Sequence, residues 1–242
     1  ELHGTDEVPL IQENDPEKGI EYIHLKELIE RINNGDKGSY FRFYNLLTRH
    51  PEHYKDINQD WLKSYSLKKK YFESYQVFIG GAGSTTYVHN SHISNFFIQA
   101  YGKKQWVLYP NKYVPFIDPP STLNGIYRDA MKRGVNSFNA FNPNYSEYPY
   151  YKYLSGYAVN LEPGDILFNP SYMWHTVKNE TDSIGIGYRW INASNSFKSS
   201  PVYYLLDLLA FRPNYFKSLK MVRENANSQF EHRMKMMKKW KK

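Results

Sequence analysis

The sequence contains no cysteine, although it is 242 residues long. This absence excludes disulfide bonds and metal sites built from thiolates. It leaves the compartment open, because cytosolic and secreted chains can both lack cysteine. A chain of this length can bury a closed core without disulfide staples.

Long hydrophobic runs are also absent. No stretch approaches the roughly 18 consecutive apolar residues that a membrane-spanning helix needs, and we therefore expect no membrane partner. The first four residues, Glu1-Leu2-His3-Gly4, do not resemble a signal peptide.

Aromatic residues, in contrast, make up 17% of the chain and include 23 tyrosines, which favours strands and a packed, partly polar interior. The net charge is +7, and part of it lies in the basic residues 233–242. Such a tail can bind nucleic acid or an anionic surface. It also fits a solvated helix end, where lysines suit the helix dipole. We favour this second interpretation, so nucleic-acid binding through the tail is not the expected function.

The order of patterns along the chain predicts a β-rich domain with helices at both ends. Residues 22–33 have apolar groups at helical spacing, and Asn34-Gly35 ends this helix. From Pro201 onward the pattern is helical again. Between these helices, strand patterns separated by turns occupy residues 40–44, 76–79, 95–100, 105–109, 157–161, 166–168 and 184–190. Short strands followed by terminal helices indicate a β-barrel or sandwich with helical additions.

Residues 111–155 are rich in Tyr, Asn and Pro and have little periodicity. We interpret them as a long insertion of the kind that often covers a site. The predicted organisation is a β domain of residues 1–195 with this insertion, followed by a helical extension of residues 196–242. In the extension, Tyr203-Tyr204-Leu205-Leu206 and Leu208-Leu209 could pack between two chains, which allows a homodimer through the C-terminal helices.

Two histidines stand out by their context. His89 follows the glycine turn of residues 80–83, and His175 follows the turn Pro163-Gly164-Asp165 and a break at Asn169-Pro170. Neutral imidazole is the commonest metal ligand in proteins, and two of them on adjacent strands of a small barrel can face one ion. Either histidine alone is explained as well by ordinary hydrogen bonding. Together, their two neighbourhoods favour a mononuclear metal site.

The residues around these histidines form two specific patterns. The first combines the glycine turn with Thr86, His89, Asn95-Phe96-Phe97, Gly102-Lys103-Lys104 and Pro110. The second runs from Pro163-Gly164-Asp165 through an apolar strand and Pro170 to Trp174-His175. Both resemble the site of jumonji-type Fe(II)/2-oxoglutarate oxygenases, in particular the asparaginyl hydroxylases. The resemblance covers about residues 38–192. It implies a mainly β fold, the double-stranded β-helix (jelly roll) of the JmjC and cupin type, with N-terminal and C-terminal helices.

The resemblance also implies roles for individual residues. His89 and His175 would be the iron ligands. Lys104 would pair with the distal carboxylate of 2-oxoglutarate, a task that suits a compact ammonium group. Thr86 would donate its hydroxyl to the same carboxylate, and Asn95 would lie near the end of the cosubstrate that binds the metal.

One position departs from the family's pattern. The family has a carboxylate ligand two residues after the first histidine, on the same strand face because side chains alternate, whereas this sequence has Ser91 there. A neutral hydroxyl should weaken iron binding and open a coordination position. The ion could be held by two histidines and water, or the open position could admit chloride, or the site could be dead and the fold used for binding. His92 could substitute only if a bulge turned it towards His89, and Asp165 is better placed to cap its turn than to bind metal.

The first functional hypothesis is an oxygenase that uses Fe(II), O₂ and 2-oxoglutarate to hydroxylate a protein or peptide side chain. His89, Ser91 and His175 would then belong to the catalytic centre, and by resemblance the reaction releases CO₂ and succinate. The alternatives are a catalytically inactive binding module and a halogenase that uses the open coordination site. The cosubstrate anchors Thr86 and Lys104 favour the oxygenase over the inactive module, because a dead site has no need of them.

Overall fold

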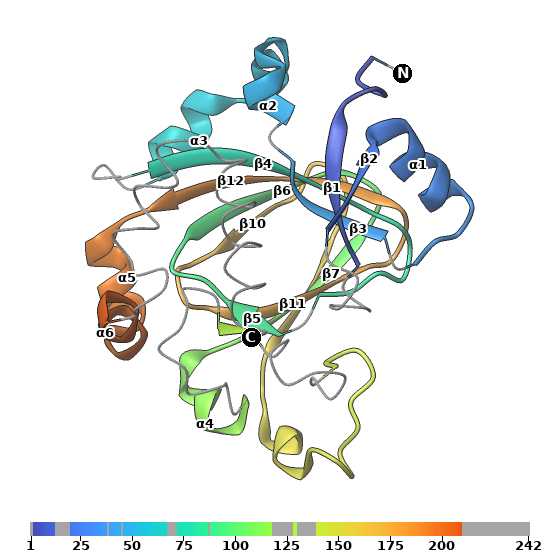
Figure 1. Cartoon of the computed structure of the whole chain (residues 1–242). Coiled ribbons are helices and arrows are strands. Elements are labelled where there is room, and N and C mark those ends of the chain that lie inside the picture. Colours follow the sequence, from blue (N-terminus) through green and yellow to red (C-terminus); the bar gives the residue numbers. More distant parts are fainter. Residues whose placement is uncertain are drawn as a thin grey trace.

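The computed structural model describes residues 2–12, 20–37, 39–44, 46–66, 72–86, 88–117, 128–129 and 139–209. Its strands form two antiparallel sheets that face each other across a shared core (Figure 1). This arrangement confirms the predicted mainly β fold, a double-stranded β-helix (jelly roll) with helices at both ends.

The larger sheet has seven strands in the spatial order β10-β6-β12-β4-β3-β1-β2. Their bounds are β1 (Glu7–Gln12), β2 (Ile20–His24), β3 (Ser39–Tyr44), β4 (Phe72–Gly80), β6 (Ser94–Tyr101), β10 (Ile166–Asn169) and β12 (Ser183–Ile191). The central strands β4 and β12 pair along their whole length, from Gly80 with Ser183 to Phe72 with Ile191. Strand β4 therefore begins earlier than the sequence indicated.

The smaller sheet has five strands in the spatial order β8-β5-β11-β7-β9. Their bounds are β5 (His89–Asn90), β7 (Lys104–Tyr109), β8 (Arg128–Asp129), β9 (Tyr157–Leu161) and β11 (Trp174–Asn179). The strands expected at residues 105–109 and 157–161 are confirmed. The two-residue strands β5 and β8 were not predicted, because their length is too short for any alternation of polar and apolar residues to show.

Alternate residues of both sheets point into the shared core. Phe97 of β6 packs against Trp106 of β7, with ring centroids 5.0 Å apart, and Leu161 and Val177 belong to the same cluster. Gly185 of β12 lies directly against Phe97, because a Cβ atom built on it would overlap with the ring. The aromatic ring thus fills the space that a glycine leaves on the neighbouring strand.

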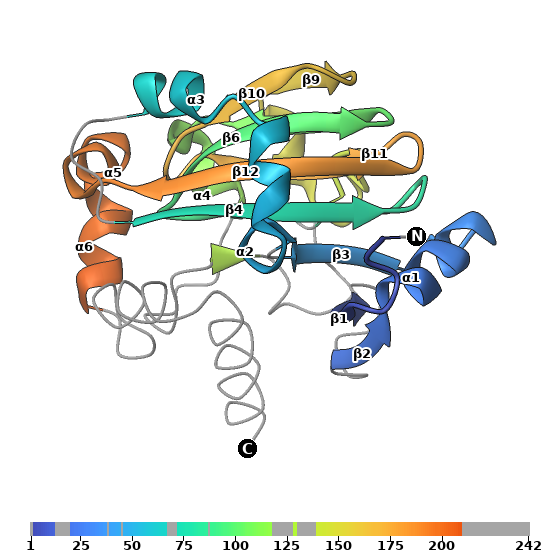
Figure 2. The same ribbon diagram turned by 90° about the horizontal axis from the view of Figure 1, so that it is seen from above.

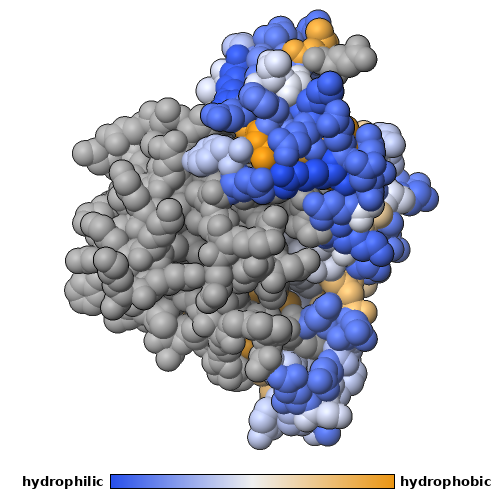
Figure 3. All heavy atoms as spheres, turned by 45° about the vertical axis from the view of Figure 1, so that its right-hand side comes forward, coloured by the Kyte–Doolittle hydropathy of each residue, from blue (hydrophilic) through white to orange (hydrophobic). Residues whose placement is uncertain are grey.

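Helix α1 (Leu25–Asn33) is shorter than predicted, because the first three residues assigned to it form the end of strand β2. Ile23 pairs with Val8 of β1, and this long-range pairing overrides the local helical spacing. Leu28 and Ile32 of the helix are buried against the sheet. The outer surface on this side of the molecule is mostly hydrophilic (Figure 3).

Three short helices lie over the outer face of the larger sheet (Figure 2): α2 (Leu46–Arg49), the 3₁₀ helix η1 (Pro51–Asp56) and α3 (Gln59–Tyr65). Leu47 and Leu62 are buried in a cluster with three aromatic residues of the sheet. The sequence predicted none of these helices, since each is too short to show a helical period.

The predicted insertion is described at residues 111–117, 128–129 and 139–155, where it contains β8, the 3₁₀ helices η2 (Asn111–Tyr113) and η4 (Pro149–Tyr153), and helix α4 (Val114–Ile117). Ile117 and Tyr151 pack with Trp174 in one buried cluster. These parts of the insertion therefore cover the outer side of the smaller sheet.

Helices α5 (Ala193–Ser199) and α6 (Pro201–Leu209) follow the last strand. Tyr203 of α6 is buried in its own chain, with its ring centroid 5.9 Å from that of Tyr172. Val202 and Leu205 are exposed. The homodimer and the domain boundary at residue 195 stay predictions, and the basic tail of residues 233–242 lies outside the described residues. None of the described helices has the length and apolar character required to cross a membrane.

Gly185→Ala should destabilise the protein by roughly 1–3 kcal/mol, because its methyl group overpacks the core against the Phe97 ring. Equilibrium unfolding in urea measures this loss. Phe97→Leu removes the ring atoms involved, so in a double-mutant cycle it should recover part of the loss caused by Gly185→Ala. Strictly additive effects of the two substitutions would contradict the contact.

Candidate metal centre

Two histidines lie side by side on neighbouring strands of the smaller sheet. His89 of β5 and His175 of β11 are direct partners in the antiparallel register. Their ring centroids are 4.2 Å apart, and the ring planes are tilted by 52°. His175 is buried and His89 is partly exposed, so the pair lies at the edge of the interior. The sheet thus brings together the two residues that the sequence singled out as metal ligands.

Hydrogen bonding determines the orientation of the His175 ring. Its Nδ1 lies 2.8 Å from the carbonyl oxygen of Met173, which can only accept, so Nδ1 carries the proton. The Asn169 amide is farther from the same nitrogen, at 3.3 Å. The Trp106 ring stacks on the imidazole with centroids 5.3 Å apart. A neutral imidazole protonated on Nδ1 presents the lone pair of Nε2, which is the arrangement typical of a metal-binding histidine.

A strained turn holds strand β5 against the beginning of β11. Tyr172 has a φ angle of +60°, a conformation that residues with side chains seldom adopt. Its amide donates a hydrogen bond of 2.6 Å to the carbonyl oxygen of Ser91. Such strain persists where the surrounding structure over-determines the backbone. The turn therefore places His89 relative to His175.

The Ser91 side chain has a local contact. Its Oγ accepts a hydrogen bond of 3.2 Å from the amide of Ile93, a pattern by which serine stabilises turns. The residue is buried, but a neutral hydroxyl brings no negative charge to the centre. Its role at the metal stays a prediction.

A carboxylate residue that the sequence did not single out is placed next to His89. Asp129 of β8 is the register partner of His89, so His175, His89 and Asp129 form one row across three neighbouring strands. No sequence pattern indicated this neighbour, because β8 is a two-residue strand within the insertion.

Lys104 of β7 is completely buried in the same barrel. Its Nζ lies 4.9 Å from the centroid of the Phe97 ring, and burial lowers the pKa of the ammonium group to about 7. Lys104 lies four positions along the strand from Leu108, the partner of His175, a separation of about 13 Å.

The other two predicted cosubstrate residues belong to the walls of the same interior. Thr86 is buried beside β11, where its Oγ1 accepts a hydrogen bond of 2.9 Å from the Val177 amide and keeps its own proton for donation. Asn95 is buried on β6 of the larger sheet, in register with Asn169. The structure therefore places Lys104 and Asn95 on strands of the two sheets that enclose the shared core, while the roles of all the predicted site residues at a ligand stay predictions.

Three further residues have structural surroundings that the sequence could only partly anticipate. His92 is buried, and its burial, with a smaller contribution from the Arg189 charge, lowers the pKa of its imidazole to about 3. Asp165 caps its turn as predicted, since its Oδ2 accepts a hydrogen bond of 2.8 Å from the Glu162 amide. Lys103 is an exposed turn residue whose Nζ is 2.6 Å from the Glu162 carboxylate.

Comparisons with known proteins agree with this architecture. Residues 11–196 match the model of the family described as cupin-like domain. The tRNA wybutosine-synthesizing protein 5 of Gallus gallus is 31% identical over 126 residues, which are 50% of this chain and 36% of that protein. HSPB1-associated protein 1 of Homo sapiens is 30% identical over 43% of this chain and 20% of its own length. The arginine-specific demethylase JMJ20 of Arabidopsis thaliana is 26% identical over 72% of this chain and 41% of its own length. The chain thus spans less than half of each of these relatives.

Lys104→Met should stabilise the protein, and by roughly 2–3 kcal/mol more at pH 6 than at pH 9. The pKa of Lys104 is about 7 in the folded protein and about 10.4 in an unfolded chain. The unfolded chain therefore binds more protons between these two values, and the stability of the parent rises with pH across this window. The parent bears the full free-energy cost of burying the Lys104 ammonium group only below about pH 7. Lys104→Met removes this cost.

Urea unfolding at both pH values measures this difference. Lys103→Met is the matched control, because Lys103 is exposed and paired with Glu162, and it should show no gain of stability at pH 6 relative to pH 9. An equal effect of Lys104→Met at pH 6 and pH 9 would contradict the lowered pKa.

Proposed function

Since the chain belongs to the family of cupin-like domains, we propose that it binds Fe(II) and 2-oxoglutarate and is an oxygenase that hydroxylates a protein or peptide side chain. The observation that carries the proposal is the pair His89 and His175 on the wall of a barrel that buries Lys104. Imidazole suits Fe(II), and a buried ammonium suits the far carboxylate of a diacid. A 2-oxo acid that is bound to a metal requires ligands for the metal and a positive group for its far carboxylate. Both kinds of group belong to this one interior.

The side chains present fit this pair of cofactors. His89 and His175 would hold the ion with neutral imidazoles, Lys104 and Thr86 would bind the distal carboxylate, and Asn95 would lie near the metal-bound end. Iron and 2-oxoglutarate, when bound, supply the oxidising power for hydroxylation, whereas the protein supplies position and a dry site.

The burial of Lys104 supports an anionic ligand. An ammonium group in an apolar interior has lost its water shell, so its charged form is disfavoured and its pKa falls to about 7. A carboxylate against it would provide an opposite charge in a medium of low dielectric constant and raise that pKa again. A diacid bound against Lys104 would therefore stabilise the charged form of its ammonium group. This supports 2-oxoglutarate as the ligand.

The absence of an acid at residue 91 leaves two outcomes at the metal. With two histidine ligands, water would fill the position of the missing carboxylate in a hydroxylase. A halogenase needs this position open to chloride.

The proposed substrate class takes support from the relatives' names. JMJ20 is named as an arginine-specific demethylase, so an amino-acid side chain is a target within the similar proteins. Another relative is named for tRNA wybutosine synthesis. Candidate peptides and tRNA are therefore both included in the assay below, and the proposal expects the peptides to be the substrates.

2-Oxoglutarate should bind only when metal is present, and its binding at pH 8 should take up close to one proton. Lys104 is largely neutral at pH 8 because its pKa is about 7, and the bound carboxylate would raise this pKa. At pH 6 the group is already protonated, so the uptake should be near zero. Calorimetric titration of the Mn(II)-loaded protein, in two buffers of different ionisation enthalpy, measures the number of protons.

Variants assign these effects to residues. Lys104→Met should weaken 2-oxoglutarate binding by about tenfold or more and remove the proton uptake, and His175→Gln should remove the metal-dependent binding. His24→Gln, on the distant strand β2, should behave like the parent.

With Fe(II) and O₂, the parent should form succinate from 2-oxoglutarate, and a peptide substrate should increase the yield. Metal-dependent binding without succinate would identify a binding module, and a chlorinated product would identify a halogenase.

Ser91→Asp should tighten Mn(II) binding, because it adds a negative charge at a metal–oxygen distance of about 2 Å. Electron paramagnetic resonance of free Mn(II) measures the affinity. Asp165→Asn, in an exposed turn, is the control and should leave the affinity unchanged. Weaker binding in Ser91→Asp would mean that residue 91 does not face the ion.

A further inference from the structure

Three histidines converge on the outer side of the larger sheet. His3 precedes strand β1, whereas His50 and His53 lie at the beginning of η1. The N-terminal segment and α2 are close together above the larger sheet, while β5 with His89 lies on the opposite side of the barrel (Figure 1). This histidine cluster is therefore separate from the candidate metal centre.

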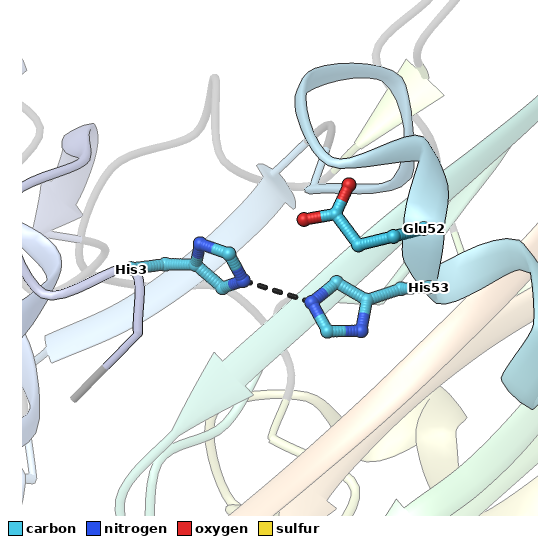
Figure 4. Close-up of side chains that lie close together, drawn as sticks. All are labelled: His3, Glu52 and His53. Carbon is cyan, nitrogen blue, oxygen red and sulfur yellow. Dashed lines mark hydrogen bonds between the residues drawn. The ribbon is translucent and has the colours of Figure 1, made fainter.

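The rings of His3 and His53 are nearly perpendicular and meet through their Nε2 atoms. Their Nε2 atoms are 2.8 Å apart (Figure 4), and Glu52 extends its carboxylate towards them from the same 3₁₀ helix as His53. Ligand atoms of these three residues all lie within 4.8 Å of one another. Two imidazoles and a carboxylate are a typical donor set for Zn(II) with one position left for water.

From this geometry we propose a second metal site, formed by His3, Glu52 and His53, that binds a divalent transition-metal ion of the Zn(II) type. Two facing Nε2 atoms at hydrogen-bond distance share one proton, which one ring donates and the other accepts. Metal–nitrogen bonds of about 2.0–2.1 Å at a tetrahedral angle separate two nitrogens by about 3.3 Å. Replacing the shared proton with the ion therefore moves each nitrogen by only about 0.3 Å.

A neighbouring set of His3, Asp6 and His50 is less suited to the ion, although its ligand atoms are equally close. The Asp6 carboxylate already lies 2.7 Å from Nε2 of His50 and 3.9 Å from the Arg49 guanidinium. Binding an ion would break these contacts. The Glu52 side chain, in contrast, is 57% exposed, and its carboxylate has only a longer contact of 3.7 Å with Nδ1 of His50. The ring centroids of His50 and His3 are 3.6 Å apart, with the planes tilted by 34°, so the His50 ring packs against the shared ligand.

The proposed site would tie the segment before β1 to the helices that lie over the sheet. Strands β1 and β2 form one edge of the larger sheet, and the backbone carbonyl of Asp6 accepts a hydrogen bond of 2.8 Å from Leu25 at the beginning of α1. An ion held by His3 and His53 would therefore join this edge to η1. A ligand that binds only the folded state stabilises it in proportion to its occupancy.

Zinc titration of the untagged protein, by competition with a chromophoric chelator, tests the proposal. His89→Gln/His175→Gln removes the candidate centre, and this variant should still bind one Zn(II). In the same background, His3→Gln, His53→Gln and Glu52→Gln should each weaken the remaining site by about tenfold or more. His24→Gln is the matched control, because His24 contacts Thr5 in the same region and lies outside both ligand sets. It should leave the affinity unchanged.

Thermal unfolding provides a second measurement. Zn(II) should raise the Tm of the His89→Gln/His175→Gln variant, and this increase should disappear when Glu52→Gln is added, a surface change that leaves the core intact. Loss of all zinc binding in His89→Gln/His175→Gln would overturn the proposal. The proposal would also be overturned if the Zn(II) affinity depended on Asp6 and His50 but not on Glu52 and His53. Because this background lacks the candidate centre, the result is independent of the proposed oxygenase activity.

Discussion

The register between strands β5 and β11 is the constraint from which the arrangement of the candidate centre follows. A strand as short as β5 has few backbone hydrogen bonds of its own, and a shift by one residue would turn His89 to the other face and bring Asn90 in its place. The bond from the Tyr172 amide to the Ser91 carbonyl opposes such a shift. The same strand β11 pairs with β7 on its other side, so the position of Lys104 depends on the same alignment.

The interior combines an apolar lining with a few ionisable groups. Lys104 lies over the Phe97 ring, and Trp106 links that ring to His175 through two aromatic contacts. In such surroundings each ionisable group tends towards its neutral form, as the lowered pKa values of Lys104 and His92 illustrate. In the proposed site, a neutral imidazole would bind the metal, and a partly neutral lysine would regain its charge when an anionic ligand binds.

The two histidine groups of the chain differ in what holds them. His89 and His175 belong to paired strands, and the orientation of His175 is determined by a backbone carbonyl. His3 and His53 come from a turn and a 3₁₀ helix, and they meet through their own side chains. The first pair is therefore in place before any metal binds. The second depends more on the ion, which would strengthen a contact between two segments far apart in the sequence.

The sequence by itself determined the fold class and the course of most strands, and it indicated His89, His175 and Lys104 as site residues. These features are local: alternation, glycine turns and short motifs are each contained in a few neighbouring residues. Only the tertiary structure decided that residues 22–24 are strand, that Asp129 stands next to His89, and that His3 meets His53. Each of these results from the pairing or packing of distant segments. The free energy from local conformational preferences is smaller than the free energy that such contacts gain from burial and hydrogen bonds. Local preferences therefore neither reveal these contacts nor prevent them.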